Sequence, residues 1–167
     1  MQPASGGGPL AAQVTASAAE LLAAIARASR EGWPEAGGVA AQAESLRDRV
    51  APLAQLSAEA YQHALATDGG DYEFGRAYAK AAEPPLRIAE AATAVRALAA
   101  HVAEYANPEL RADAVTAGLI AASCARAAAE LVAVNLTVSA DDERVRRADF
   151  LAEEAARTAE LARATRE

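Results

Sequence analysis

Apolar residues recur every three to four positions along most of the chain, which is the spacing of one face of an α-helix. In the first such stretch the larger apolar side chains are Leu10, Val14, Leu21, Leu22 and Ile25. Alternation of apolar and polar residues, which is typical of a half-buried strand, is absent. The pattern therefore predicts an all-α fold.

Clusters of glycine and proline divide this pattern into about five to six helical segments. Pro52 is expected to kink or split the second segment, because proline removes a backbone hydrogen bond inside a helix. Ser139 is a good N-cap for the last segment. The sequence predicts one domain over residues 1–167, an up-and-down helical bundle. Its predicted helices cover residues 9–30, 39–67, 72–82, 84–105, 109–136 and 139–165.

Alanine makes up 51 of the 167 residues, and only 4% of the residues are aromatic. Alanine is the best helix former, so the composition supports the helical pattern. An alanine core buries little apolar surface per residue, however, and larger side chains are scarce. We therefore expect the helices to approach each other closely and the subunits to pair through their helices.

The charge and the cysteine count exclude several classes of function. The net charge is −7 and the pI is about 4.9, so the chain lacks the basic surface of a nucleic-acid binder or a membrane-surface protein. One cysteine and two histidines cannot form a cysteine/histidine metal site. No basic segment precedes an apolar run at the N-terminus, and the apolar stretch 112–136 contains three charged residues. We expect a soluble, cytoplasmic protein without a metal, a nucleic-acid partner or a membrane span.

The first candidate site is the glycine run Gly6, Gly7 and Gly8, which stands directly before the helix predicted to begin at Pro9. The first turn of a helix has free N–H groups, and glycine allows a ligand to approach the backbone closely. The run could therefore hold an anionic or carbonyl-bearing group. The alternative is an unstructured N-terminal tail. A phosphate loop is excluded, because no strand precedes the run and no Gly-Lys-Ser/Thr follows it.

The second candidate site is Asp113, which follows Asn107 and Pro108 at the start of a long apolar helix. A carboxylate there either uses the helix dipole or acts as a general acid/base in a cleft. Asn135, late in the same helix, needs a hydrogen-bond partner if it is buried. It therefore contacts either a neighbouring loop or a polar ligand, and the Tyr61 hydroxyl has the same two interpretations.

Five short segments, taken in order, resemble the formiminotransferase-cyclodeaminase C-terminal family, which contains cyclodeaminase domains and bacterial methenyltetrahydrofolate cyclohydrolases. The first is the glycine-rich opening, and the second ends in an Ala-Tyr pair. The third reads Pro-Leu-Arg-Ile-Ala-Glu, the fourth begins with Asn-Pro and ends at an aspartate, and the fifth is Asn-Leu. They are residues 5–12, 58–61, 85–90, 107–113 and 135–136.

The resemblance implies a helical homodimer that binds a tetrahydrofolate derivative as its substrate, without a metal, in a cleft near the glycines. Two reactions belong to the family. Either N10 of 5-formimino-tetrahydrofolate attacks the formimino carbon and ammonia leaves, or water opens the methenyl bridge. Both need proton transfer. By resemblance, Asp113 is the catalytic residue, and the ligand-binding residues are Gly6, Gly7, Gly8, Pro9, Tyr61, Asn107 and Asn135.

The chain differs from the family pattern at three positions. Pro9 and Ala112 stand where the family has serine, and Ser57 stands where it has an acidic residue. These differences keep two alternatives open. In one, the same scaffold cyclises or deaminates a different small substrate in a specialised pathway. In the other, the protein is a non-catalytic helical interaction protein.

Overall fold

The computed structural model describes residues 6–136 and 141–164. The predicted N-cap Ser139 and Ser5, the first residue of the glycine motif, lie outside the described residues. The described residues contain helices and no strand, which confirms the predicted all-α bundle. The helices are α1 (Gly7–Ala28), α2 (Ala36–Val50), α3 (Leu53–Leu65), α4 (Asp71–Ala81), α5 (Glu83–Tyr105), the 3₁₀ helix η1 (Pro108–Leu110), α6 (Arg111–Asn135) and α7 (Glu143–Ala164).

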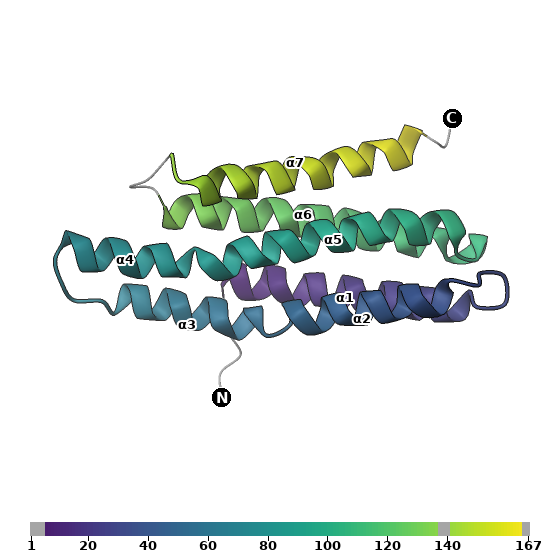
Figure 1. Ribbon diagram of the computed structural model, residues 1–167, viewed down its shortest axis with the longest axis horizontal. Coiled ribbons are helices and arrows are strands. Elements are labelled where there is room, and N and C mark those ends of the chain that lie inside the picture. The colour runs from purple at the N-terminus through teal and green to yellow at the C-terminus, as the bar shows by residue number, and fades with distance from the viewer. Residues whose placement is uncertain (1–5, 137–140, 165–167) are drawn as a thin grey trace.

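Two pairs of consecutive helices form long, nearly continuous rods (Figure 1). Pro52 splits the predicted second helix into α2 and α3, but Ala51 and Pro52 keep helical dihedrals, so α3 continues in the direction of α2. Only Ala82 separates α4 from α5, and it too is helical. Together with α1, α6 and α7, these rods make the up-and-down bundle.

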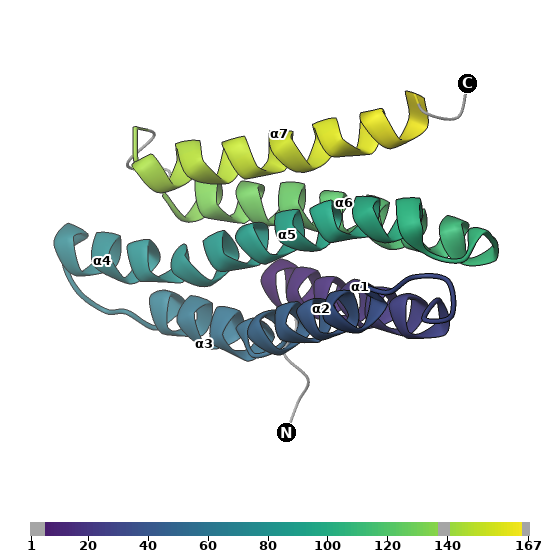
Figure 2. The ribbon, with the colours of Figure 1, turned by 45° about the vertical axis from the view of Figure 1, so that its right-hand side comes forward.

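The rods lie in three layers, which the rotated view in Figure 2 separates. The first layer holds α1 and the α2–α3 rod, the middle layer holds the α4–α5 rod and α6, and α7 covers the middle layer from the other side. The most extensive helix contacts are those of α5 with α6 and of α1 with α2 and α6. The middle helices are therefore covered on both sides.

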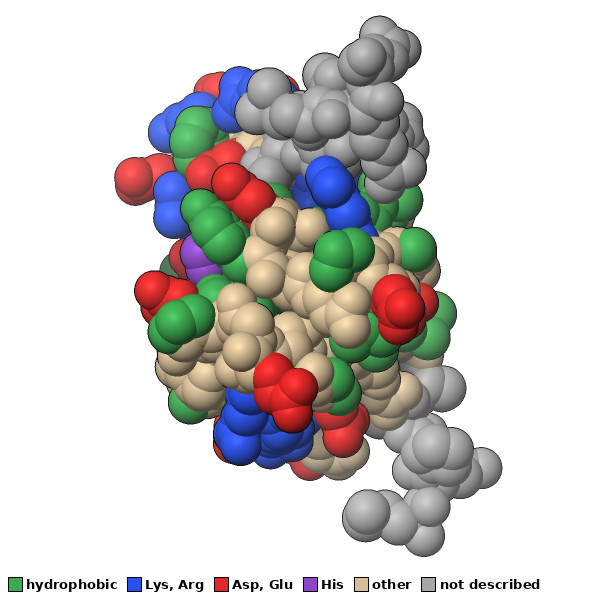
Figure 3. All heavy atoms as spheres, turned by 90° about the vertical axis from the view of Figure 1, so that its right-hand side faces the viewer, with side chains coloured by type: hydrophobic (Ala, Val, Ile, Leu, Met, Phe, Trp, Pro, Cys, Tyr) green, Lys and Arg blue, Asp and Glu red, His purple; other side chains and the backbone are tan. Residues whose placement is uncertain are grey.

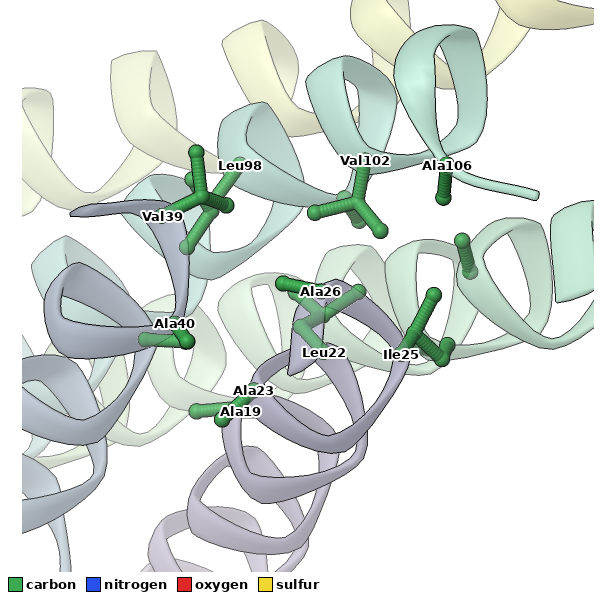
Figure 4. Close-up of a cluster of buried hydrophobic side chains, with 14 of the residues drawn as sticks. Ala19, Leu22, Ala23, Ile25, Ala26, Val39, Ala40, Leu98, Val102 and Ala106 are labelled. Carbon is green, nitrogen blue, oxygen red and sulfur yellow. The ribbon is translucent and has the colours of Figure 1, made fainter. Parts of the chain in front are cut away.

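Alanine and a few larger side chains fill the core between the first two layers (Figure 4). Leu22 of α1 and Val102 of α5 are fully buried there, and Trp33 closes the core at the α1–α2 loop. Ala19 and Ala23 lie on the side of α1 that faces Ala40 of α2. Because alanine side chains are short, the helix axes can come close, as the composition predicts.

At Gly118, α6 lies close against α5. A Cβ atom at this position would lie 3.0 Å from the Cβ of Ala99 and 2.6 Å from Nη1 of the buried Arg96. Gly75, in the middle of α4, has no such neighbour within 4 Å. The two glycines therefore stand in opposite environments on helices of the same chain.

Gly118→Ala is expected to lower the free energy of unfolding. Overpacking costs about 1–3 kcal/mol, and the helix propensity of alanine returns about 1 kcal/mol, so the net loss is about 1 kcal/mol. Gly75→Ala, the matched control, is expected to stabilise the protein by about 1 kcal/mol, because it gains the propensity without a clash. Thermal or denaturant unfolding of both variants measures whether each substitution lowers or raises the free energy of unfolding. Stabilisation by both substitutions would contradict the close packing at Gly118.

Two helical segments, α1 and residues 108–135, are long and apolar enough to cross a membrane by length and composition alone. Both pack against other helices of the bundle, and 56% and 44% of the tested windows are buried inside it. A core helix of a soluble protein passes the same test, so this finding is weak evidence for a membrane span.

Candidate functional site

A pocket of about 290 Å³ opens where the N-terminus of α1 meets α3, the α4–α5 junction and the end of α6. The glycine run, Tyr61 and Asn135, which are far apart in the sequence, meet in this pocket. Its wall consists of Gly6, Gly7, Gly8, Pro9, Ser57, Ala58, Tyr61, Gln62, Ala81, Pro85, Leu131, Val134 and Asn135.

The glycines are needed for the backbone at the pocket wall. Gly6 has φ 132°, a conformation that side chains with a Cβ rarely adopt. A Cβ on Gly8 would lie 2.1 Å from Oγ of Ser57, so α1 and α3 meet here without space for a side chain. The helix begins at Gly7, two residues before the predicted Pro9. The N–H groups of Gly7 and Gly8 belong to the first turn, which has no acceptor within the helix.

Asn135 and Tyr61 reach the pocket in different ways. Asn135 is half-buried, and its Nδ2 donates a hydrogen bond of 3.2 Å to the carbonyl of Ala81, which ties the end of α6 to α4. Tyr61 on α3 is 46% exposed at the pocket wall. The sequence left open whether Asn135 contacts a neighbouring segment or a polar ligand; the structure shows a contact with a neighbouring segment, and its position at the pocket wall keeps the contact with a ligand as a prediction.

The described pocket wall contains no charged side chain. Its polar groups are the Ser57 and Tyr61 hydroxyls, the Gln62 and Asn135 amides, and backbone groups. Such a wall can orient a neutral, hydrogen-bonding ring system. It lacks a carboxylate or an imidazole that could transfer a proton at neutral pH.

Asp113 and Asn107 lie at the other end of the bundle. Asp113 is exposed in the first turn of α6, and Asn135 ends the same helix 22 residues later, about 33 Å away at 1.5 Å per residue. Figure 3 looks onto this end, where acidic side chains stand among exposed backbone, hydrophobic side chains and several basic side chains. Within one subunit, the structure does not bring Asp113 into the pocket.

Asn107 has a local structural function. Its Oδ1 accepts a hydrogen bond of 3.1 Å from the N–H of Glu109 and so caps η1, and its own N–H donates to Oγ of Ser29 at 3.0 Å. These bonds join the α5–α6 connection to the end of α1. Asn107 is therefore also outside the pocket of its own subunit, and its predicted contact with a ligand stays a prediction.

Seven pocket residues were not identified from the sequence as ligand contacts: Ala58, Ala81 and Pro85, and four others on α3 and α6. Ser57 and Gln62 come from α3, and Leu131 and Val134 come from α6. Ser57 had a signal, because it replaces the acidic residue of the family pattern. Gln62, Leu131 and Val134 are an exposed amide and apolar residues on ordinary helical faces, and nothing local distinguishes them.

The first turn of α7 is fixed next to this region by Arg144. Its guanidinium donates two hydrogen bonds to the carboxylate of Asp142, at 3.0 and 2.8 Å, and a third to the carbonyl of Ala79 at 2.8 Å. Hydrogen bonds from the Arg144 side chain and N–H hold the pKa of Asp142 at about 2. The carbonyls of Ala79 and Ala81, near the end of α4, thus hold α7 and α6 respectively.

The Asp142–Arg144 pair is expected to stabilise the protein only above about pH 4. The pKa of Asp142 falls from 3.8 to about 2 on folding, so its contribution is complete above the unfolded value and is lost as the pH falls from about 4 to about 2. Unfolding of wild type and Asp142→Asn against pH should therefore show a difference that shrinks over this window. Asp149→Asn, an exposed aspartate on the same helix, is the control. If the difference in stability between wild type and Asp142→Asn does not depend on pH, the Asp142–Arg144 pair does not stabilise the protein.

Among residues 6–136 and 141–164, no group of three or more His, Cys, Asp or Glu side chains could hold a metal ion. The expectation of a metal-independent protein stays a prediction.

A family model described as Formiminotransferase-cyclodeaminase matches residues 1–154 of the chain. The chain belongs to this family. The match includes the pocket wall and Asp113, and it confirms the resemblance found in the five sequence segments. The crystal structure of formiminotetrahydrofolate cyclodeaminase from Thermotoga maritima superimposes with a TM-score of 0.83 and 23% sequence identity, over 96% of this chain and 85% of that chain. This likeness shows that the family member has the same helical fold. A search of curated proteins finds no match.

Proposed function

We propose that this family member is a one-carbon folate enzyme, a methenyltetrahydrofolate cyclohydrolase or a formiminotetrahydrofolate cyclodeaminase. The observation that carries the proposal is the pocket at the start of α1, where motifs separated by up to 129 residues, from Gly6 to Asn135, meet in a chain that the family model covers almost completely. The substrate is a tetrahydrofolate derivative, and no metal is required.

The neutral, polar wall suits the edge of a pterin ring, which is rich in hydrogen-bond donors and acceptors. The Gly7 and Gly8 N–H groups, Ser57, Gln62 and Asn135 are available to orient it. The reacting carbon lies between N5 and N10. In the cyclohydrolase, water adds to it and the C–N5 bond breaks. In the cyclodeaminase, N10 attacks it and ammonia leaves. Both reactions pass through a tetrahedral carbon, and both need a group that moves a proton.

The proton-transferring group has to come from outside the pocket, because the wall has no carboxylate. We assign this role to Asp113 of the partner subunit in a homodimer. The surface for this dimer is an apolar groove of about 480 Å³ between α1 and α6, which includes Leu10, Val14, Ile120 and Ser123. No charged residue lines the groove, and the side chains of Leu10 and Ile120 are 61% and 40% exposed.

The position of the groove supports this assignment. On α6 the groove spans residues 119–127, and the midpoint between Asp113 and Asn135 is residue 124. A two-fold axis perpendicular to α6 at this midpoint exchanges the two ends of the helix between subunits. It sets the partner's Asp113 beside Asn135, at the pocket. The same axis pairs the two grooves, and the burial of their apolar side chains stabilises the dimer.

Turnover of two substrates tests the proposal. Wild-type protein is expected to accelerate the loss of the near-UV absorbance of 5,10-methenyl-tetrahydrofolate, or the release of ammonia from 5-formimino-tetrahydrofolate. The substrate should also raise the melting temperature. Absence of both turnover and a thermal shift would overturn the folate assignment.

One observation favours a second candidate, a related reaction on another small substrate. Ser57, in place of the acidic residue of the family pattern, packs against Gly8 and leaves the pocket of the subunit neutral. A thermal shift with folate but no turnover of either compound would favour this candidate. The third candidate, a non-catalytic interaction protein, predicts neither effect. In each case we place the protein in the cytoplasm, as its acidic composition and single cysteine led us to expect.

A further inference from the structure

A second cavity adjoins the first. It has a volume of about 520 Å³ and lies between α4, the end of α6 and the start of α7. Val134 and Asn135 line both cavities, so the two lie next to each other at the end of α6. The second wall consists of Asp71, Tyr72, Phe74, Gly75, Arg76, Tyr78, Ala79, Val134, Asn135, Leu136 and Arg144.

Three aromatic side chains of α4 contribute to this wall. The rings of Phe74 and Tyr78 lie 4.6 Å apart, and Tyr72 and Phe74 are 71% and 48% exposed. Only 4% of the chain is aromatic, so three aromatic residues on one eleven-residue helix are a marked concentration. Exposed aromatic rings at a cavity are typical of a surface that stacks on a ligand ring.

Among the described residues of the wall, Arg76 is the cation available to a ligand. Arg144 is held by Asp142 and by the Ala79 carbonyl, so its guanidinium is engaged. Arg76 has no carboxylate partner in the described part of the chain, and its guanidinium lies 5.8 Å from the ring centre of Tyr72. Asp71, the acidic residue of the wall, is in the first turn of α4, where the helix dipole stabilises it.

Asn135 stands at the junction of the two cavities. Its Nδ2 is bound to the Ala81 carbonyl, and within the described residues its Oδ1 accepts no hydrogen bond. The amide is thereby fixed in place while its acceptor remains open to a ligand that extends from one cavity to the other.

We propose that the α4 cavity is a second binding subsite, which takes an aromatic ring with an attached carboxylate that is linked to the group in the first pocket. The ring stacks on Tyr72 and Phe74, and the carboxylate pairs with Arg76. This inference extends the proposed function, because a folate consists of a pterin joined to an aminobenzoyl-glutamate. The pterin then occupies the α1 pocket and the aminobenzoyl-glutamate occupies the α4 cavity.

Fragment binding tests the subsite independently of catalysis. The probe is p-aminobenzoyl-glutamate, titrated into the full-length protein by calorimetry or NMR. Arg76→Gln and Tyr72→Ala change exposed side chains, so both variants are expected to fold, which circular dichroism checks. Each is expected to weaken binding about threefold to tenfold. Arg87→Gln, which removes an exposed arginine of α5, is the matched control and should bind like wild type.

A second probe separates the two subsites. Tetrahydropterin without the tail should bind equally to wild type and to Arg76→Gln. The subsite is overturned if wild type does not bind p-aminobenzoyl-glutamate saturably, or if Arg76→Gln binds it as tightly as wild type. Fragment binding without turnover of a folate would overturn the proposed function and leave the subsite intact. If the protein turns over a folate and Arg76→Gln does not change the KM, the proposed function stands and the subsite is overturned.

Discussion

Asp113→Asn is expected to reduce turnover by a factor of about 100 or more, because it removes the carboxylate that moves the proton while keeping the size of the side chain. The melting temperature should change little, since Asp113 is exposed in its own subunit and makes no hydrogen bond or ion pair within the described residues. Steady-state kinetics with the better of the two substrates, together with thermal unfolding, measures both effects.

The matched control for this variant is Asp149→Asn, which removes an exposed carboxylate of α7. It should leave kcat unchanged. If Asp113→Asn turns over substrate at the wild-type rate, the proton donor or acceptor is another group and the assignment of Asp113 is wrong. A change in KM alone would assign Asp113 to binding instead of chemistry.

Ile120→Asp is expected to separate the dimer and to abolish turnover with it. Ile120 is 40% exposed near the middle of the apolar groove, so the substitution places an unpaired carboxylate from each subunit in the interface. Such a buried charge weakens association by at least about a hundredfold. Light scattering coupled to size-exclusion chromatography measures the mass, and the turnover assay measures the consequence.

Leu56→Asp is the control for Ile120→Asp. Leu56 on α3 is 43% exposed and lies outside the groove, so it tests the same change on another surface. It should remain dimeric and active. An Ile120→Asp protein that stays dimeric would show that the subunits pair through another face, and a monomer with full activity would show that each subunit carries a complete site.

The sequence predicted most of the fold because the signals are local. Pro52, Gly69 and Asn107 with Pro108 interrupt the chain at positions that coincide with helix ends, since proline and glycine act on the backbone of their own residue. Alanine stabilises the helix between these positions in almost any environment. The predicted start of the first helix, Pro9, was two residues late, because glycines have little helix propensity of their own. In the structure α1 begins at Gly7, and Gly8 packs against Ser57.

The site was predictable only where a motif marked it. The glycines, Tyr61 and Asn135, to which the family resemblance gives ligand contacts, line one pocket, and their contact with a ligand stays a prediction. Leu131 and Val134 carry no local signal, because their contribution depends on how the end of α6 packs against α1. The distance between Asp113 and Asn135 was already contained in the uninterrupted helix predicted over residues 109–136, which α6 confirms. The sequence led us to expect a homodimer, and the position of Asp113 outside the pocket of its own subunit is the reason for proposing that the partner subunit supplies this residue.

The most direct test is the activity of heterodimers made from two inactive variants. Asp113→Asn lacks the carboxylate, and Ala58→Phe fills the pocket of about 290 Å³ with a phenyl ring. A heterodimer purified through two different tags contains one site with the intact pocket of one subunit and Asp113 of the other, so about half of the wild-type turnover should return. Heterodimers as inactive as the two parent proteins would contradict a site shared between subunits.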